Sequence, residues 1–331
     1  MHWLERHWYR IAPLHILLLP VSFIFRLLSA MRRTLYRSGI LPSEKLAVPV
    51  IVIGNITVGG SGKTPLTLWL AQQLLDNGWH PGIISRGFGG GKTIAPQAVH
   101  SSSSPDEVGD EAVMMAQHGL CPVWVGRDRP ATGRALLHAH PECDVLLSDD
   151  GLQHYRLQRD VEIAVVDGVR RFGNGCLLPA GPLREAPSRL NEVDAVIING
   201  GIVSGKEYGM QLDGSIFQNL LDPDIIMRPP DFQHMKLHAI AGIGHPFRFF
   251  AHLNNLGLTG QVHPFPDHHR YTPADLAYAD ADAILMTEKD AVKCRPFAIK
   301  KCWVLRVEAQ LDPALTQHIL ERIAPNGRKA A

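Results

Sequence analysis

A glycine-rich loop between a strand and a helix is the feature of this sequence that most constrains its fold. Residues 48–54 (VPVIVIG) form an apolar run rich in β-branched side chains, typical of a strand buried on both faces. The loop 54–65 (GNITVGGSGKTP) follows, and the segment 65–78 has leucines at helical spacing and ends at an Asn-Gly pair. This order of strand, loop and helix predicts a phosphate-binding loop in an α/β fold.

The spelling of the loop departs from the usual G-x-x-x-x-G-K-[ST], because Thr57 stands where the outer glycine is expected. Backbone N–H groups at the start of a helix can still converge on a phosphate. Lys63 is expected to bind the outer phosphates, and the hydroxyl of Thr64 is placed for Mg²⁺. The predicted nucleotide-binding residues are Thr57, Val58, Gly59, Gly60, Ser61, Gly62, Lys63 and Thr64.

A second apolar run ends in two acids, Asp149 and Asp150, within CDVLLSDDGLQH (143–154). Phosphate-binding-loop proteins hold Mg²⁺ with an acid at the end of such a strand. The alternative is a pair of solvated acids at a strand end. The loop upstream favours the metal interpretation for both aspartates, although the sequence does not say which is the main ligand.

Three further groups of polar residues have two readings each. Asp110 opens a helix after a serine-rich loop, where an acid can serve catalysis or simply satisfy helix N–H groups. The run HPFPDHHRY (263–271) matches no strong zinc pattern, and His268 beside Asp267 is either a proton-handling residue or a surface histidine. Arg170 and Arg171 follow a predicted strand, as candidates for phosphate contact or as surface arginines.

The N-terminal segment is basic and apolar at once. Up to residue 40 it carries six arginines against one acid, around the charge-free run 11–25. That run is shorter than the roughly 20 residues of a spanning helix, and a cleaved signal peptide fits poorly. We expect a helix in the membrane interface with one narrow polar face, kinked or divided at Pro20. The predicted polar face is His15, Ser22, Arg26, Ser29 and Arg33.

Length and composition fit a two-domain protein of a reducing compartment. The chain has 331 residues, a net charge of +1 and five scattered cysteines with no C-x-x-C, which argues against a disulfide framework and against bulk nucleic-acid binding. Apolar runs and amphipathic segments alternate as in a parallel α/β sheet. The predicted parts are an N-terminal membrane-associated helix (1–40), a phosphate-binding-loop domain (41–205), a linker or hairpin (206–235) and a smaller α/β domain (236–331), with substrate in the cleft between the domains.

With these pieces placed, the chain closely resembles the tetraacyldisaccharide 4′-kinases, the lipid A kinases of Gram-negative bacteria. The motifs that carry the resemblance span nearly the whole chain, and the second and third are specific to the family: VIGNITVGGSGKTP, SDDGLQHYRL, VVDGVRRFGNGCLLPAGPLRE, SRGFGG, VGDE, AGIGHPFRFF, PDHHRY and TEKDAVKCR. In this family Thr57 is the normal spelling of the loop. Ala112 departs from the proline that usually follows GDE.

The resemblance implies an ATP- and Mg²⁺-dependent enzyme on the cytoplasmic face of the bacterial inner membrane. It would phosphorylate the 4′-hydroxyl of a tetraacyldisaccharide 1-phosphate, the lipid A precursor, with no obligate protein partner. The family's Asp–His pair for the hydroxyl proton matches Asp110 and His268, with His263 and His269 as rivals if the motif match slips.

Two alternatives stay open on the residues alone. A GTPase or metal-insertion ATPase would read its base with [NT]-K-x-D, and the chain offers TEKD (287–290) with the lysine one place late. A membrane-bound nucleotide switch would bind ATP without transferring phosphate to any lipid.

Overall fold

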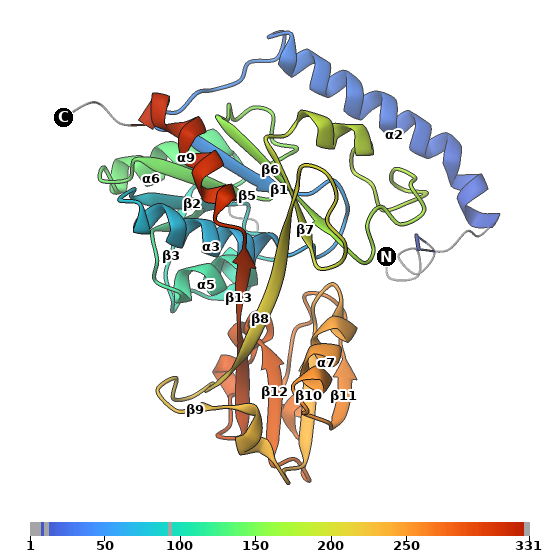
Figure 1. Cartoon of the computed structure of the whole chain (residues 1–331), viewed down its shortest axis with the longest axis vertical. Coiled ribbons are helices and arrows are strands. Elements are labelled where there is room, and N and C mark those ends of the chain that lie inside the picture. Colours follow the sequence, from blue (N-terminus) through green and yellow to red (C-terminus); the bar gives the residue numbers. More distant parts are fainter. Residues whose placement is uncertain (1–7, 10–12, 92–94, 328–331) are drawn as a thin grey trace.

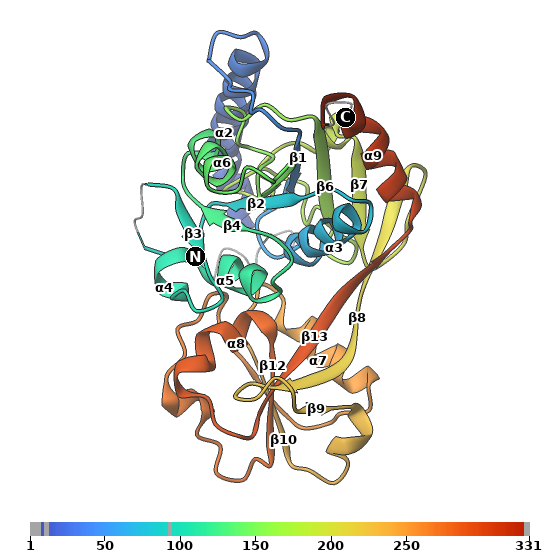
Figure 2. The same ribbon diagram turned by 90° about the vertical axis from the view of Figure 1, so that its left-hand side faces the viewer.

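The computed structural model describes residues 8–9, 13–91 and 95–327, and it consists of two lobes joined by a long two-stranded ribbon (Figures 1 and 2). In the described residues a single sheet of 13 strands runs through both lobes. Its order is β11-β10-β12-β13-β8-β7-β6-β1-β5-β2-β4-β3, with β9 paired to β8. The fold is therefore mixed α/β with a large parallel part, as the sequence predicts.

The upper lobe is built around β1 (Val50–Gly54), which lies between β5 (Val145–Asp149) and β6 (Val161–Asp167), parallel to both. All five residues of β1 are buried, because helices cover both faces of the sheet. Parallel strands end at the same edge, so the loop after β1 and the acids after β5 come together. The remaining strands of this lobe are β2 (Pro81–Ser85), β3 (Gln97–Val99), β4 (Val123–Val125) and β7 (Ala195–Asn199).

The helices of the upper lobe pack on its sheet through apolar side chains. α3 (Lys63–Asp76) starts directly at the glycine loop and buries Leu66, Leu70 and Leu74. The others are α4 (Pro105–Val108), α5 (Asp110–Gln117), α6 (Arg129–Ala139) and the short η1 (Pro187–Glu192). The sequence analysis did not predict α6, whose apolar periodicity is weak.

The ribbon that joins the lobes consists of β8 (Glu207–Asn219) and β13 (Cys302–Leu311), which run antiparallel. The region predicted as a linker or hairpin (206–235) therefore holds a 13-residue strand shared by both lobes. Only three of the 13 residues of this strand are buried, so no continuous apolar run marks it in the sequence. After β8, the same region forms the short strand β9 (Ile226–Met227) and the 3-10 helix η2 (Pro229–Phe232).

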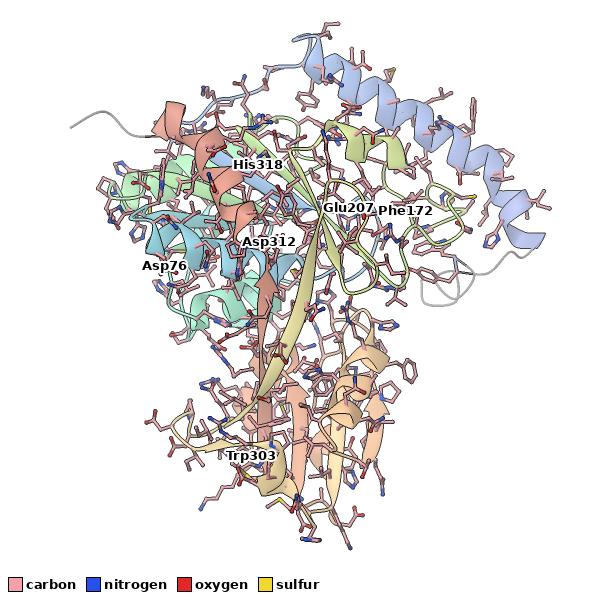
Figure 3. All side chains as sticks on the ribbon, in the orientation of Figure 1. Asp76, Phe172, Glu207, Trp303, Asp312 and His318 are labelled. Atoms are coloured by element: carbon pink, nitrogen blue, oxygen red, sulfur yellow. The ribbon has the colours of Figure 1, made fainter. Side chains whose placement is uncertain are left out.

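The lower lobe adds parallel strands and helices to the far end of the ribbon. Its elements are β10 (Leu237–Ala241), α7 (Pro246–Asn255), β11 (Gln261–Pro264), η3 (Pro273–Leu276), β12 (Ala283–Thr287), α8 (Glu288–Cys294) and η4 (Arg295–Phe297). The final helix α9 (Ala314–Gly327) lies on the upper lobe, where Leu315, Ile319 and Ile323 join its core. His318 of α9, which is labelled in Figure 3, also contacts the Asp194 carbonyl at 3.2 Å. The C-terminal segment thus returns to the lobe that carries the glycine loop.

The N-terminal helix α2 (Pro13–Arg37) lies across the upper lobe and runs without interruption through Pro20 (Figure 1). Of the two outcomes predicted for Pro20, a divided helix is wrong, and a kink stays a prediction. Ser22 is buried, donates to the Leu177 carbonyl at 2.9 Å and accepts from the Ala180 N–H at 3.0 Å. The sequence predicts this polar face but not what covers it: His15 and Ser22 are buried against the rest of the protein.

The opposite side of α2 is apolar and exposed. The large side chains there are 45–75% exposed: Ile16, Leu17, Leu19, Val21, Phe23, Ile24, Leu27, Leu28 and Met31. The segment His15–Arg37 is long and apolar enough to cross a membrane, by length and composition alone. Only 11% of its most apolar 18-residue stretch is buried in the protein. A helix that turns its polar face to its own protein and its apolar face outward fits contact with lipid.

Candidate active site

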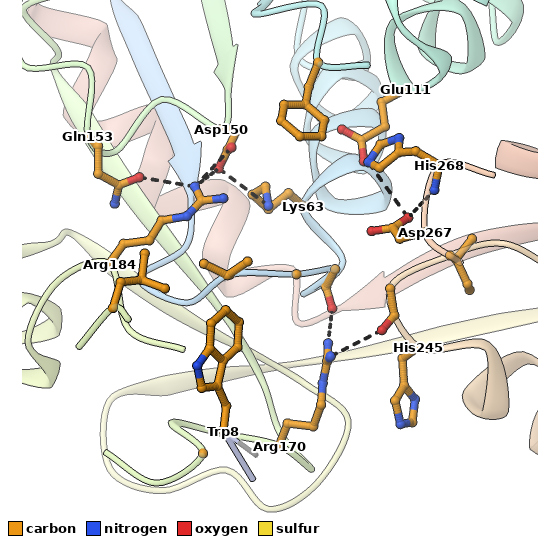
Figure 4. A pocket seen from close by; sticks show the side chains of 18 of the residues that line it. Trp8, Lys63, Glu111, Asp150, Gln153, Arg170, Arg184, His245, Asp267 and His268 are labelled. Atoms are coloured by element: carbon orange, nitrogen blue, oxygen red, sulfur yellow. Dashed lines mark hydrogen bonds and ion pairs between the residues drawn. The ribbon is translucent and has the colours of Figure 1, made fainter. Parts of the chain in front are cut away.

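A cleft of about 1880 Å³ opens between the two lobes and the inner side of α2. The glycine loop, the end of β5, the start of α5 and the PDHH segment all contribute to its walls (Figure 4). Of the predicted site residues it is lined by Val58, Gly59, Gly60, Lys63, Asp149, Asp150, Arg170 and His268. Residues far apart in the sequence therefore meet where the sequence analysis placed substrate.

The conformation of the glycine loop at the start of α3 is fixed by Gly62 and by two asparagine side chains. Gly62 caps α3 with φ 95°, and a Cβ there would lie 2.2 Å from the Nδ2 of Asn199, so only glycine fits. The same Nδ2 donates to the Ser61 carbonyl at 2.9 Å. Asn55 Nδ2 donates to the Gly59 carbonyl and to Ser61 Oγ, both at 3.2 Å.

Neither amide was singled out from the sequence. Asn55 is inside the quoted loop, and Asn199 ends a strand, but nothing local shows that either points back at the loop. The start of the loop is also fixed. The Val58 N–H donates to the Pro182 carbonyl at 2.8 Å, and Thr57 pairs with Leu183, so the Val58 N–H already has its partner.

The two acids after β5 differ in their surroundings. Asp150 lies 3.5 Å from Lys63 Nζ and accepts from Arg184 Nη1 at 3.1 Å. Burial opposes ionisation of Asp150, but Lys63 and Arg184 outweigh it and lower its pKa. Asp149 is 1% exposed, and burial, reinforced by Glu111, raises its pKa to about 7.

Asp149 also has an unsatisfied atom. In the part of the chain that the structure describes, its buried Oδ1 has no hydrogen-bond partner. A buried carboxylate oxygen without a donor fits a cation, which would displace the proton and supply the missing interaction. Thr64, the second residue of α3, is the third member of the predicted metal set, and its role there stays a prediction.

Asp110 and His268 come from opposite lobes and contact each other beside the cleft, whose lining includes His268 but not Asp110. Asp110 is the first residue of α5 and is 4% exposed; its Oδ2 lies 3.0 Å from His268 Nδ1. Burial acts against both charged forms, but the hydrogen bond outweighs it, so the pKa of Asp110 is lowered and that of His268 is raised. His268 adopts φ 57°, and the Phe88 ring lies 5.0 Å from its ring.

Lys289 lies behind this pair. Its Nζ is 3.4 Å from His268 Nε2, 3.1 Å from Glu111 Oε1 and 3.2 Å from Asp267 Oδ1. An ammonium group only donates, so it favours the tautomer of His268 that carries its proton on Nδ1 and donates to Asp110. From the sequence, Lys289 is notable only as part of the TEKD motif, and no local pattern assigns it to the site.

The rival histidines lie elsewhere. His263 stacks on His238 and Tyr278, and His269 stacks on Phe265. Neither lines the cleft. The described residues contain no cluster of three or more His, Cys, Asp or Glu arranged to hold a metal ion. A Mg²⁺ held by Thr64, one acid and nucleotide phosphates needs no such cluster.

The TEKD motif cannot read a guanine base. Its Asp290 is fully buried and accepts from the Gly242 N–H at 3.1 Å and from Thr287 Oγ1 at 2.7 Å. This carboxylate joins β12 to β10 and is not available to a nucleotide. The GTPase alternative loses its main support.

The two arginines predicted to contact phosphate, Arg170 and Arg171, lie in different places. Arg170 reaches the glycine loop: its Nη2 donates to the Gly60 carbonyl at 2.5 Å, while its Nε pairs with Asp167 at 3.0 Å (Figure 4). Arg171 donates to the Ile202 carbonyl at 2.7 Å and does not line the cleft. Only Arg170 is brought to the site.

Comparison with known proteins agrees with this geometry. A family model described as tetraacyldisaccharide-1-P 4′-kinase matches residues 14–324. The tetraacyldisaccharide 4′-kinase of Methylobacillus flagellatus is 51% identical over 97% of this chain and 96% of its own length, and that of Azoarcus sp. is 49% identical over 98% and 96%. The structure of LpxK from Aquifex aeolicus in complex with ATP matches with a TM-score of 0.80 and 29% identity, over 94% of this chain and 99% of that one. The chain therefore belongs to the tetraacyldisaccharide-1-P 4′-kinase family.

Proposed function

We propose that this chain transfers the γ-phosphoryl group of ATP to the 4′-hydroxyl of a tetraacyldisaccharide 1-phosphate in the cleft between its lobes, with Asp110 and His268 handling the hydroxyl proton. The observation that carries the proposal is the 3.0 Å contact of Asp110 with His268, which lines the cleft together with the glycine loop. It supplies a base for an alcohol acceptor, which neither a nucleotide switch nor a GTPase of the kind considered above requires.

In the reaction we propose, the 4′-oxygen attacks the γ-phosphorus as the bond to the bridging oxygen breaks and ADP leaves with the electron pair. The hydroxyl proton passes to Asp110. A low pKa suits this role, because in a loose transition state the proton becomes acidic only as the new P–O bond forms. Asp110 thus stays ionised and orients the hydroxyl, and the proton that His268 donates from Nδ1 to Asp110 holds the carboxylate in place.

Charge on the phosphates is met by the glycine loop. Backbone N–H groups of Gly59 to Thr64, Lys63 and the α3 N-terminus favour the triphosphate, and Arg170 braces the loop at Gly60. When ATP binds, Lys63 turns from Asp150 to the phosphates. Thr64 and Asp149 are the residues that fit Mg²⁺, with Asp150 beside them paired to Arg184. Bound there, the ion would neutralise the phosphate oxygens.

The acceptor comes from the membrane. The apolar, exposed side of α2 fits insertion into a lipid surface, and the arginines of the N-terminal segment fit contact with headgroups on the cytoplasmic side. A membrane-embedded α2 would bring the cleft to the headgroup layer, where a disaccharide with acyl chains presents its sugars.

The proposal is tested by incubating the full-length protein in detergent micelles with γ-labelled ATP or GTP, Mg²⁺ and the lipid acceptor. We expect a bisphosphorylated lipid labelled at the 4′ position, with ATP strongly preferred. Nucleotide hydrolysis without labelled lipid, or turnover with GTP alone, would overturn the proposal.

A further inference from the structure

Lys289 of α8 lines the cleft but has no step of its own in the reaction proposed above. Its side chain is 14% exposed, and an ammonium group carries three N–H donors and no acceptor. Three acceptors surround its Nζ: Glu111 Oε1 at 3.1 Å, Asp267 Oδ1 at 3.2 Å and His268 Nε2 at 3.4 Å. Each N–H group therefore has a partner, which a cation with so little access to water requires.

The partners of Lys289 come from both lobes. Glu111 belongs to α5 of the upper lobe and directly follows Asp110, whereas Asp267 and His268 lie beyond β11 in the lower lobe (Figure 4). One ammonium group thus binds the sequence neighbour of Asp110 and the sequence neighbour of His268. We call Glu111, Lys289 and Asp267 the lobe clamp.

The start of α8 fixes Lys289 on the lower lobe. Thr287 caps the helix and accepts from the Asp290 N–H at 3.2 Å. The Asp290 carboxylate in turn accepts from the N–H of Gly242, just after β10, at 3.1 Å. Thr287 and Asp290 of the TEKD motif therefore hold the helix to the sheet. The lysine between them extends to Glu111 of the other lobe.

The charges of the lobe clamp attract only while the ammonium group is present. Glu111 Oε1 and Asp267 Oδ1 each lie within 3.2 Å of the same nitrogen, so two carboxylates from opposite lobes face one cation. Burial opposes the charge of Lys289, but the neighbouring carboxylates, with that of Glu111 first, outweigh it and raise the pKa of the lysine. Without that cation, the two carboxylates would repel each other and separate the lobes beside the Asp110–His268 contact.

Two roles are open to a cation in this position, and they affect His268 in opposite directions. Burial lowers the pKa of His268, its hydrogen bond to Asp110 and the charge of Asp267 raise it, and the charge of Lys289 lowers it. Lys293 lies on the far side of the pair, 3.9 Å from Asp110 Oδ2. If the lysine acts through charge alone, its removal raises the pKa of His268 further. If it holds the lobes together, its removal lets His268 leave Asp110, and the pKa falls toward about 6.5.

We propose that Lys289 is a positioning residue for phosphoryl transfer, which holds the two lobes together so that His268 meets Asp110. The three contacts of its ammonium group carry this proposal. It rests on the proposed function, because it names what keeps the pair for the hydroxyl proton in place. It also gives the lysine of the TEKD motif a role that does not involve a nucleotide base.

The test combines a titration of His268 with a kinetic cycle, both on the full-length protein in detergent micelles. Protein carrying isotope-labelled histidine would be titrated by NMR as wild type, Lys289→Met and Lys289→Arg, with His268→Gln identifying the signal. The kcat for lipid phosphorylation would be measured for Lys289→Met in the wild-type and His268→Ala backgrounds. Glu288→Gln is the matched control, because Glu288 Oε1 also contacts α5, at 3.1 Å from His118 Nε2, and Glu288 does not line the cleft.

In Lys289→Met, the pKa of His268 should fall from its raised value toward about 6.5. The kcat should drop about 10- to 100-fold, because small displacements of reacting groups carry such costs. Lys289→Arg keeps the charge and should retain most of the activity. In the His268→Ala background, Lys289→Met should change kcat by less than about twofold, since the lysine acts through the pair. Glu288→Gln should leave kcat and the pKa of His268 near their wild-type values.

Four results would overturn the inference. A higher pKa of His268 in Lys289→Met would show that the lysine acts through its charge alone. An unchanged pKa together with an unchanged kcat would remove its role. Losses in kcat that multiply in the double variant, or an equal loss in Glu288→Gln, would assign the effect to general packing between the lobes. A wild type that phosphorylates no lipid would instead refute the proposed function, and the titration, which needs no substrate, would still test the lobe clamp.

Discussion

Replacing Asn199 by aspartate removes one hydrogen bond to the glycine loop and keeps the size of the side chain. Asn199 Nδ2 donates to the Ser61 carbonyl at 2.9 Å, whereas its Oδ1 accepts from Arg248 Nη2 at 2.7 Å. Aspartate retains the second contact and loses the first, since a carboxylate cannot donate. The Ser61 carbonyl is then left in a residue that is 1% exposed, opposite a negative oxygen.

An unsatisfied buried acceptor costs about 1–3 kcal/mol. If that cost falls on the loop conformation that binds phosphate, the KM for ATP rises roughly 5- to 100-fold. The KM for the lipid acceptor should change little, because Asn199 does not line the cleft. Steady-state kinetics with each substrate varied in turn would measure both effects.

Asn219→Asp is the matched control. Asn219 also donates its amide to a carbonyl, that of Lys300 at 2.7 Å, but at the far end of the ribbon. It should lower the melting temperature without raising the KM for ATP. A KM for ATP in Asn199→Asp that stays within about twofold of wild type would refute the reasoning, because a supporting bond worth its usual energy cannot be lost without that effect.

Three other predictions concern the Asp110–His268 pair, the metal site and the membrane contact. The lowered pKa of Asp110 keeps this carboxylate ionised above about pH 4. Because the pKa of His268 is raised in the folded protein, the Asp110–His268 pair contributes its full stability below about pH 6.5. That stability is lost as the pH rises through the folded-state pKa of His268. Thermal unfolding should therefore show a larger loss for His268→Gln at about pH 5.5 than at about pH 9; equal losses would contradict the pairing. Asp149→Asn should raise the Mg²⁺ concentration for half-maximal activity about 10-fold or more, and more than Asp150→Asn does, with EDTA abolishing turnover; the reverse order would make Asp150 the main ligand. Ile24→Asp with Leu27→Asp should reduce sedimentation with vesicles by about 10²-fold or more, since each buried charge costs about 2.5–3.5 kcal/mol in a membrane; unchanged sedimentation would place the contact elsewhere.

Much of the catalytic region could be predicted from the sequence, because its residues sit at fixed points of regular elements. The glycine loop is recognisable in the sequence because it stands between a predicted strand and a predicted helix. Acids at the end of a neighbouring parallel strand lie beside it, since parallel strands end at the same edge of the sheet. Asp110 was harder, since an acid at a helix start has an ordinary explanation. Only the resemblance to a family, and then the contact with His268, separates the two readings.

The residues that the sequence did not reveal act across long separations. Asn199 and Lys289 lie far along the chain from Ser61 and Glu111, and no local pattern encodes those distances. The polar residues of α2 were found, but their partners were not. Ser22 is satisfied by carbonyl and N–H groups near residue 180, which is why the apolar side is left to face outward.

The most direct test of the account is a double-mutant cycle on the acid–base pair, with labelled γ-phosphate transfer to tetraacyldisaccharide 1-phosphate as the readout. Wild type, Asp110→Ala, His268→Ala and the double variant would be compared at saturating ATP and Mg²⁺. We predict that Asp110→Ala loses about 10²-fold or more in kcat, and that adding His268→Ala costs little further because the two act as a unit. Losses that multiply in the double variant, or full activity in Asp110→Ala, would contradict the claim that this pair handles the hydroxyl proton.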